Sequence, residues 1–81
     1  MNLKETVSMM ISADYKERFK AEYLQLEIRV KGLRNMLKKY KEGSLTFKPS
    51  CSYDLLNSQL KAMELYATYL EERAEIEGID L

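Results

Sequence analysis

Apolar residues recur at steps of three or four along the first long stretch of the chain. The series consists of Tyr15, Phe19, Tyr23, Leu26, Val30, Leu33, Leu37 and Tyr40. This spacing places the side chains on one face of a helix, and it predicts a long helix over about residues 13–42. Ser12 or Asp14 can cap the start of this helix, and Gly43 stands where a C-cap glycine belongs.

A second long stretch carries two apolar strips rather than one. The first strip, Leu60, Met63, Ala67, Leu70 and Ala74, is a single helical seam, and Ala62, Leu65, Tyr66 and Tyr69 form another strip beside it. The pattern predicts a helix over about residues 53–77, with Ser50 or Ser52 as its cap and Gly78 at its end. A helix in a two-helix hairpin needs one seam, so we expect the second strip to pack against other copies of the chain.

The two helices, joined by a link at residues 43–52, define the domain organisation. We expect an N-terminal arm at residues 1–11 and a helical hairpin at residues 12–81. The predicted fold class is therefore all-α: an antiparallel two-helix hairpin with a short N-terminal arm or helix, assembling into a homo-oligomeric helical bundle.

Three positions outside the seams carry further structural expectations. Leu45 and Phe47 are the apolar residues of the link, and we expect them to pack back against the end of the hairpin. Gly32 interrupts the first helix, where it costs about 1 kcal/mol relative to alanine. We interpret it as a point where a neighbouring backbone comes close.

The small size of the chain favours self-assembly. Folds of 81 residues commonly need a disulfide, a metal or a partner subunit for stability. Cys51 is the only cysteine and there is no histidine, so an internal disulfide and the common zinc sites are excluded. A partner subunit is the support that remains.

The overall charge and hydropathy give no reason to expect nucleic-acid or membrane binding. The chain has 13 basic and 13 acidic residues, so bulk electrostatics does not attract it to DNA or to a membrane surface. No apolar run is long enough to span a bilayer, and the N-terminus lacks the apolar core of a signal peptide. We expect a cytoplasmic protein, which a single unpaired cysteine also suits.

The residues needed for catalysis are missing. Without histidine, serine–histidine and cysteine–histidine nucleophiles are impossible. Glycine-rich phosphate loops are absent, and Cys51 is interpreted as a packed residue at the hairpin end. The acidic residues near the C-terminus, Glu71, Glu72, Glu75 and Glu77, are expected to form a solvated helix face. We therefore predict a protein that is not an enzyme and uses no metal or cofactor.

The charges are nevertheless unevenly distributed. Six bases and no acid lie between Arg29 and Lys41. In one interpretation they offset the dipole at the C-terminus of the helix. In the other they form an anion site, because Lys31, Arg34 and Lys38 share one helix face near Tyr40 and Phe47. Cations with aromatic rings suit a nucleotide, which presents both phosphate and base.

The order of residues also resembles a known family. The positions that carry the resemblance are Arg18, Phe19, Lys31, Leu33, Leu55, Leu56, Gln59, Met63, Tyr66, Leu70 and Arg73. Over about residues 14–81 they are similar to the helical-hairpin domain of phage anti-CBASS and anti-Thoeris cyclic-nucleotide sponges. The resemblance implies a phage protein that sequesters cyclic oligonucleotide or cyclic ADP-ribose signals of bacterial antiviral defence without cleaving them. It also implies assembly from several hairpins, often as hexamers, with ligands between protomers.

Some members of this group carry an additional β-rich domain for one ligand class, and this chain has none. The expected ligand is therefore a cyclic di- or trinucleotide. The candidate ligand-binding residues are Tyr15, Arg18, Lys31, Arg34, Gln59, Tyr66, Tyr69 and Arg73. The bases would bind phosphates, the tyrosines would stack on nucleobases and Gln59 would contact base edges. A two-fold interface would present each residue twice. Each tyrosine could instead be an ordinary core or interface residue.

Two other functions remain open. The chain could be a small interaction protein, an adaptor or anti-repressor, that binds a host protein through its second apolar strip. It could also bind nucleic acid through residues 29–41, which would make binding strongly dependent on salt. The zero net charge and the acidic C-terminal half argue against nucleic acid.

Overall fold

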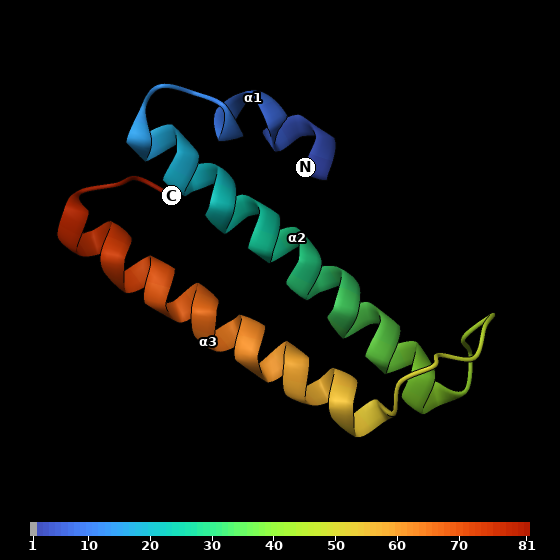
Figure 1. Ribbon diagram of the computed structural model, residues 1–81. Coiled ribbons are helices and arrows are strands. Elements are labelled where there is room, and N and C mark those ends of the chain that lie inside the picture. Colours follow the sequence, from blue (N-terminus) through green and yellow to red (C-terminus); the bar gives the residue numbers. More distant parts are fainter. Residues whose placement is uncertain (1) are drawn as a thin grey trace.

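The computed structural model describes residues 2–81, and all of its regular elements are helices. A 3₁₀ helix, η1 (Leu3–Thr6), leads into the short α1 (Val7–Met10), which is followed by α2 (Tyr15–Glu42) and α3 (Tyr53–Glu77). The two long helices lie side by side and antiparallel, and the N-terminal segment folds back onto α2 (Figure 1). The predicted all-α hairpin with a short N-terminal helix is confirmed.

Each long helix begins and ends at a residue suited to that place. The Asp14 carboxylate accepts a hydrogen bond from the Lys16 amide (3.0 Å), and the Ser52 hydroxyl accepts one from the Leu55 amide (3.1 Å). These bonds satisfy amides that the first turn leaves without partners. Gly43 and Gly78 end the helices with φ angles of 74° and 70°, a left-handed conformation that glycine adopts without steric cost.

The core lies along the contact between α2 and α3. Phe19, Leu26, Val30 and Leu37 of α2 are buried against Leu60, Ala67, Leu70 and Ala74 of α3, with Ile79 closing the open end. All of these except Ile79 belong to the two predicted seams, so the three-four spacing identified most of the buried positions, although Tyr15 of the first seam is exposed. The chain measures 43 × 24 × 16 Å, a shape that leaves the other helix faces open.

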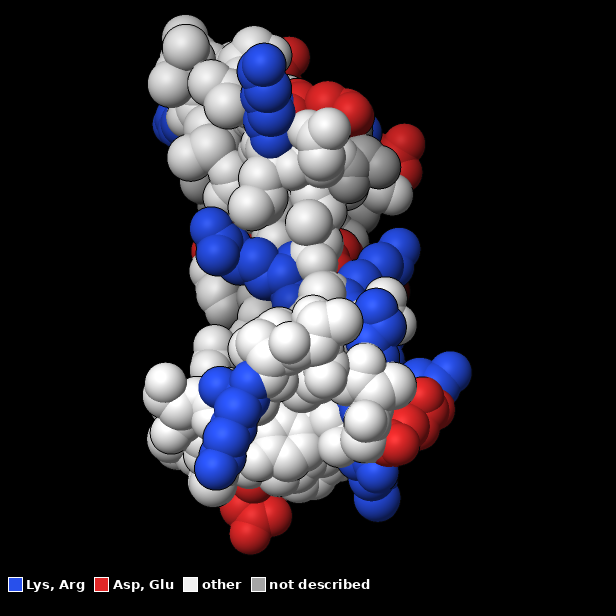
Figure 2. Space-filling model, turned by 90° about the vertical axis from the view of Figure 1, so that its right-hand side faces the viewer, with Lys and Arg blue, Asp and Glu red and all other residues white. Residues whose placement is uncertain are grey.

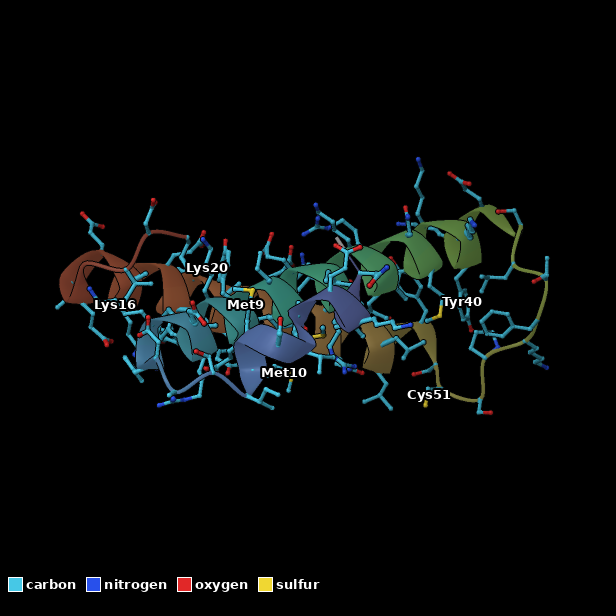
Figure 3. The ribbon with its side chains drawn as sticks, turned by 90° about the horizontal axis from the view of Figure 1, so that it is seen from above. Met9, Met10, Lys16, Lys20, Tyr40 and Cys51 are labelled. Atoms are coloured by element: carbon cyan, nitrogen blue, oxygen red, sulfur yellow. The ribbon has the colours of Figure 1, made fainter. Side chains whose placement is uncertain are left out.

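The N-terminal segment is held on α2 by a buried hydroxyl. Thr6 is fully buried; its Oγ1 donates to the Leu3 carbonyl (2.7 Å) and accepts from Gln25 Nε2 (2.9 Å). The same Gln25 amide contacts the sulfur of Met10, and Ala21 beneath the segment is fully buried. Figure 3, seen from above, shows this segment lying over α2, with Met9 and Met10 marked.

Two structural expectations are wrong. Phe47 does not pack tightly on the hairpin end, because 57% of it is exposed; Leu45 beside it is half-buried. No backbone approaches Gly32, since a Cβ built there meets nothing within 4 Å.

Within residues 2–81, no helix is both long enough and apolar enough to cross a membrane.

Candidate functional site

A cluster of aromatic and charged side chains joins the two long helices at the open end of the hairpin. Arg73 donates from Nη2 to the hydroxyl of Tyr15 (2.9 Å) and from Nε to Glu77 (3.2 Å). The Tyr15 hydroxyl in turn donates to Glu77 Oε1 (2.9 Å). The Arg73 guanidinium also lies 4.9 Å from the centre of the Phe19 ring, within the range of a cation–π contact.

The electrostatics of this cluster keep Arg73 charged. Desolvation acts to lower the pKa of Arg73, but the bonds to Glu77 and Tyr15 outweigh it and leave the pKa raised. The side chain of Arg73 remains 52% exposed. A guanidinium carries five N–H donors, of which two are used here. The cluster therefore offers a fixed positive charge with donors to spare.

Four of the candidate residues line one continuous stripe on α3. Gln59, Tyr66 and Arg73 recur every seven residues, and Tyr69 lies one turn from both Tyr66 and Arg73. Tyr66 is 43% and Tyr69 56% exposed. The Gln59 side-chain amide makes a long contact with the Met63 sulfur (3.8 Å). Through the bond from Arg73 to Tyr15, the structure brings five of the eight candidates onto one surface, which we call the α3 stripe.

The other three candidates lie elsewhere. Arg34 pairs with Glu64 (2.8 Å) across the hairpin, and its hydrogen bond lowers the pKa of that carboxyl group. Nine residues, or two and a half helical turns, separate Glu64 from Arg73. The Arg34 pair is therefore on the opposite side of α3 from the stripe. Arg18 donates to the carbonyl of Ser12 (2.7 Å) and secures the turn into α2.

Lys31 belongs to a third surface. With Leu24, Glu27 and Ile28 it lines a hollow of about 280 Å³ on α2. These four residues lie on the face of α2 turned away from the core seam. The structure therefore does not join Lys31 to the tyrosines of α3.

Sequence reasoning missed two carboxylates that contact the tyrosines. Glu77 completes the Arg73 cluster, and Glu71 accepts a hydrogen bond from the Tyr23 hydroxyl (3.2 Å). All four C-terminal acids are exposed, as expected, but Glu71 and Glu77 also accept hydrogen bonds from tyrosines of α2. The alignment of the two antiparallel helices could have predicted this contact. A hairpin that pairs Arg34 with Glu64 also brings Tyr23 near Glu71.

A second hollow lies at the loop end of the hairpin. It measures about 490 Å³ and is lined by Tyr40, Gly43, Leu45, Thr46, Phe47, Lys48 and Pro49. Tyr40 packs edge-on against Tyr53, and Lys41 lies 6.0 Å from the centre of the Tyr53 ring. Figure 2 shows this end at the bottom of the view, as an uncharged surface bordered by basic side chains and, at its lower and right edges, by acidic ones. Tyr40 and Phe47 of the suggested anion site line this hollow, whereas Lys31, Arg34 and Lys38 are not among its lining residues.

Cys51 lies at the same end, exposed on the surface rather than packed (Figure 3). Its expected packing is therefore wrong. Among residues 2–81, no three cysteine or acidic side chains lie close enough together to hold a metal ion.

A model of the Sequestin family matches residues 13–76, which is most of the chain. This chain belongs to the Sequestin family. No curated protein and no solved structure is significantly similar to it.

The Sequestin match covers all of α2 and all of α3 except Glu77, and it leaves out the N-terminal segment. Membership implies a sequestering, non-catalytic role, for which affinity is needed and reactive groups are not. The α3 stripe suits this role, because its charged guanidinium and exposed aromatic rings can bind an anionic, ring-containing molecule without any reactive group.

Proposed function

We propose that this Sequestin protein is a phage sponge that captures cyclic di- or trinucleotide signals of bacterial antiviral defence. It binds the signal inside the host cell, as a homo-oligomer, and holds it without cleavage. The observation that carries the proposal is the family membership together with the cation and tyrosines of the α3 stripe. The resemblance to phage anti-defence sponges supports the ligand class.

Several parts of the stripe have a role in this proposal. Arg73 binds a phosphate through its unused N–H donors, and its bonds to Tyr15 and Glu77 hold it in position. Tyr66 offers an exposed ring on which a nucleobase stacks. Gln59 presents an amide, which can donate and accept at the edge of a base.

The first test is isothermal titration of the purified protein with a panel of cyclic dinucleotides, cyclic trinucleotides and cyclic ADP-ribose isomers. Tight binding of a cyclic di- or trinucleotide is the expected result. Heat release followed by chromatography should return the ligand intact. A linear product would contradict sequestration. Binding of cyclic ADP-ribose alone would change the proposed ligand class but would still support a sequestering function.

A pair of arginine variants tests the position of the site. Arg73→Gln should weaken ligand binding by about 10- to 100-fold, because a charge-assisted hydrogen bond contributes about 1.5–3 kcal/mol. Arg34→Gln is the matched control, since Arg34 forms an exposed ion pair with Glu64, as Arg73 does with Glu77. Equal losses in the two variants, or a loss in the control alone, would contradict the assignment of the site to the α3 stripe.

The alternative function is an adaptor or anti-repressor that binds a host protein. The exposed side chains of α3 favour it, since Leu55 is 60%, Leu65 54% and Ile76 85% exposed. In that case no nucleotide of the panel would give heat, and the purified chain would be monomeric with its apolar surface open. An oligomer that covers this surface would leave no room for such a partner.

A further inference from the structure

The exposed apolar residues of α3 follow a seven-residue repeat. Leu55, Ala62, Tyr69 and Ile76 recur every seven positions, and Leu65 and Tyr66 lie midway between the inner two. All of them are exposed in the hairpin. A seven-residue repeat is the spacing by which one helix packs lengthwise along another. With Leu55 and Ile76 added at its two ends, the second strip therefore has the pattern of a helix seam without a helix packed on it.

The second strip is also symmetric about its own centre. Residues equally distant from the midpoint between positions 65 and 66 match as Leu55 with Ile76, Ala62 with Tyr69, and Leu65 with Tyr66. A second copy running antiparallel about a two-fold axis at this midpoint would place Ala62 opposite Tyr69 of the partner subunit. A small residue facing a large one fills an interface without a clash. A parallel copy would instead place Tyr69 against Tyr69.

The charges beside the second strip favour the same direction. Lys61 and Glu72 flank it on one edge and lie almost equally far from the midpoint. In the antiparallel arrangement Lys61 faces Glu72 of the partner subunit on each side of the axis. In a parallel pair this edge of the two copies would lie on opposite sides of the interface, so Lys61 would not face Glu72 of the partner subunit. Lys61 is available for this contact, since its side chain is 70% exposed and its bond to Glu64 is long (3.7 Å).

The exposed area fits one interface of ordinary size. A compact monomer of this mass, 9.5 kDa, has an accessible surface of about 5,000 Å². The hairpin exposes 5959 Å². The excess of about 900 Å² is close to the roughly 800 Å² that each partner buries in a standard interface.

We infer that α3 pairs with α3 of a second copy, antiparallel, about a two-fold axis between residues 65 and 66. This inference specifies the self-assembly included in the proposed function. It also completes the site, because Gln59 and Arg73 are equally distant from Tyr66. Gln59 of the partner subunit therefore lies beside Arg73, and the pair of hairpins holds two equivalent sites made by both subunits.

Light scattering on two neighbouring variants tests the interface. Tyr69→Glu puts a charge into the second strip and should convert the assembled protein to a monomer or a smaller species. Thr68→Glu adds the same charge at an exposed position beside the strip and should leave the mass unchanged. Circular dichroism checks that both remain helical. A monomeric wild type, or a helical Tyr69→Glu protein of wild-type mass, would overturn the inference.

Cross-linking tests the direction of pairing and does not depend on the stability of a variant. In a Cys51→Ser background, single cysteines replace Leu55, Tyr66 or Ile76, and a short bismaleimide is added. Tyr66→Cys should link to itself, because it lies next to the axis. Leu55→Cys alone should not, since its two copies are about 32 Å apart, whereas a mixture of Leu55→Cys with Ile76→Cys should link. Self-linking by Leu55→Cys would indicate parallel helices and overturn the inference.

Neither of these tests uses a ligand, so a failed interface and a failed function can be told apart. Antiparallel pairing of α3 with no binding heat from any nucleotide would contradict the proposed sponge function and support the proposed interface. Tight nucleotide binding by a monomer would support the proposed sponge function and contradict the proposed interface.

Discussion

Tyr23 is the side chain whose ionisation the fold changes most clearly. Partial burial is the main cause, followed by the nearby carboxylates Glu27 and Glu71, and together they raise the pKa of Tyr23 to about 12. Glu71 accepts the hydrogen bond from the neutral hydroxyl. The folded state therefore favours protonated Tyr23, whereas an unfolded chain would ionise it near pH 10.

This shift predicts a pH dependence of stability. Because the pKa is higher in the folded state, its contribution is fully present below pH 10 and is lost as the pH rises from 10 to about 12. Urea unfolding between pH 9 and 12 should show the decline, and Tyr23→Phe should show less of it. Absorbance titration should show a late ionisation step in the wild type that is missing from the Tyr23→Phe variant. A variant with the same late step would contradict this assignment.

Leu70 is the largest apolar side chain that the hairpin buries completely, with 1% exposed. Leu70→Ala should lower the free energy of unfolding by about 2–5 kcal/mol, from lost burial and the cavity left behind. A chain of this size has only about 4–12 kcal/mol of stability in total, so the variant should be close to unfolding. Urea midpoints at one protein concentration measure the effect.

Ile11→Ala is the control for this comparison, since Ile11 is apolar but 80% exposed. Its midpoint should change by no more than about 0.5 kcal/mol in free energy. If the two variants lost similar stability, the buried seam would not be the main support of the hairpin.

At the scale of the helices, local pattern predicted most of the fold and little of the site. The three-four spacing marks Leu26, Val30 and Leu70 as core, because burial of one helix face imposes that period. The cluster of Tyr15, Arg73 and Glu77 has no such period, since it depends on how α2 and α3 are aligned against each other. The exposure of Phe47 could not be predicted from the sequence either, because the link between the helices has no repeating pattern.

The glycines of α2 allow a matched prediction of opposite sign. Gly43→Ala should destabilise the hairpin by about 1 kcal/mol, because Gly43 has a φ of 74° that a side chain makes costly. Gly32→Ala should stabilise it by about 0.5–1 kcal/mol, because Gly32 is helical and a Cβ there meets nothing within 4 Å. Thermal unfolding of both variants measures the difference. A destabilised Gly32→Ala protein would indicate that another subunit approaches this position.

At the scale of the whole molecule, the hairpin is elongated and open. Its thickness of 16 Å is little more than one helix with its side chains, so a single seam supplies most of the core. A protein built in this way gains stability from whatever covers its remaining faces. The proposed self-assembly and ligand binding would therefore be linked, because Tyr66 and Tyr69 belong to both the α3 stripe and the second strip.

This linkage predicts how the complete protein responds to its ligand. At a free concentration one hundred times the dissociation constant, a ligand that binds only the folded state stabilises it by about 2.7 kcal/mol. For a domain of this size that corresponds to a rise in melting temperature of about 10–20 °C. Scanning calorimetry with the cyclic nucleotide, at fixed protein concentration, measures this rise. A linear dinucleotide of the same bases is the control and should give a smaller shift, because its free ends lose more conformational entropy on binding. Equal shifts with both would mean that the site recognises bases and phosphates without requiring the ring, which would contradict a protein specialised for cyclic signals.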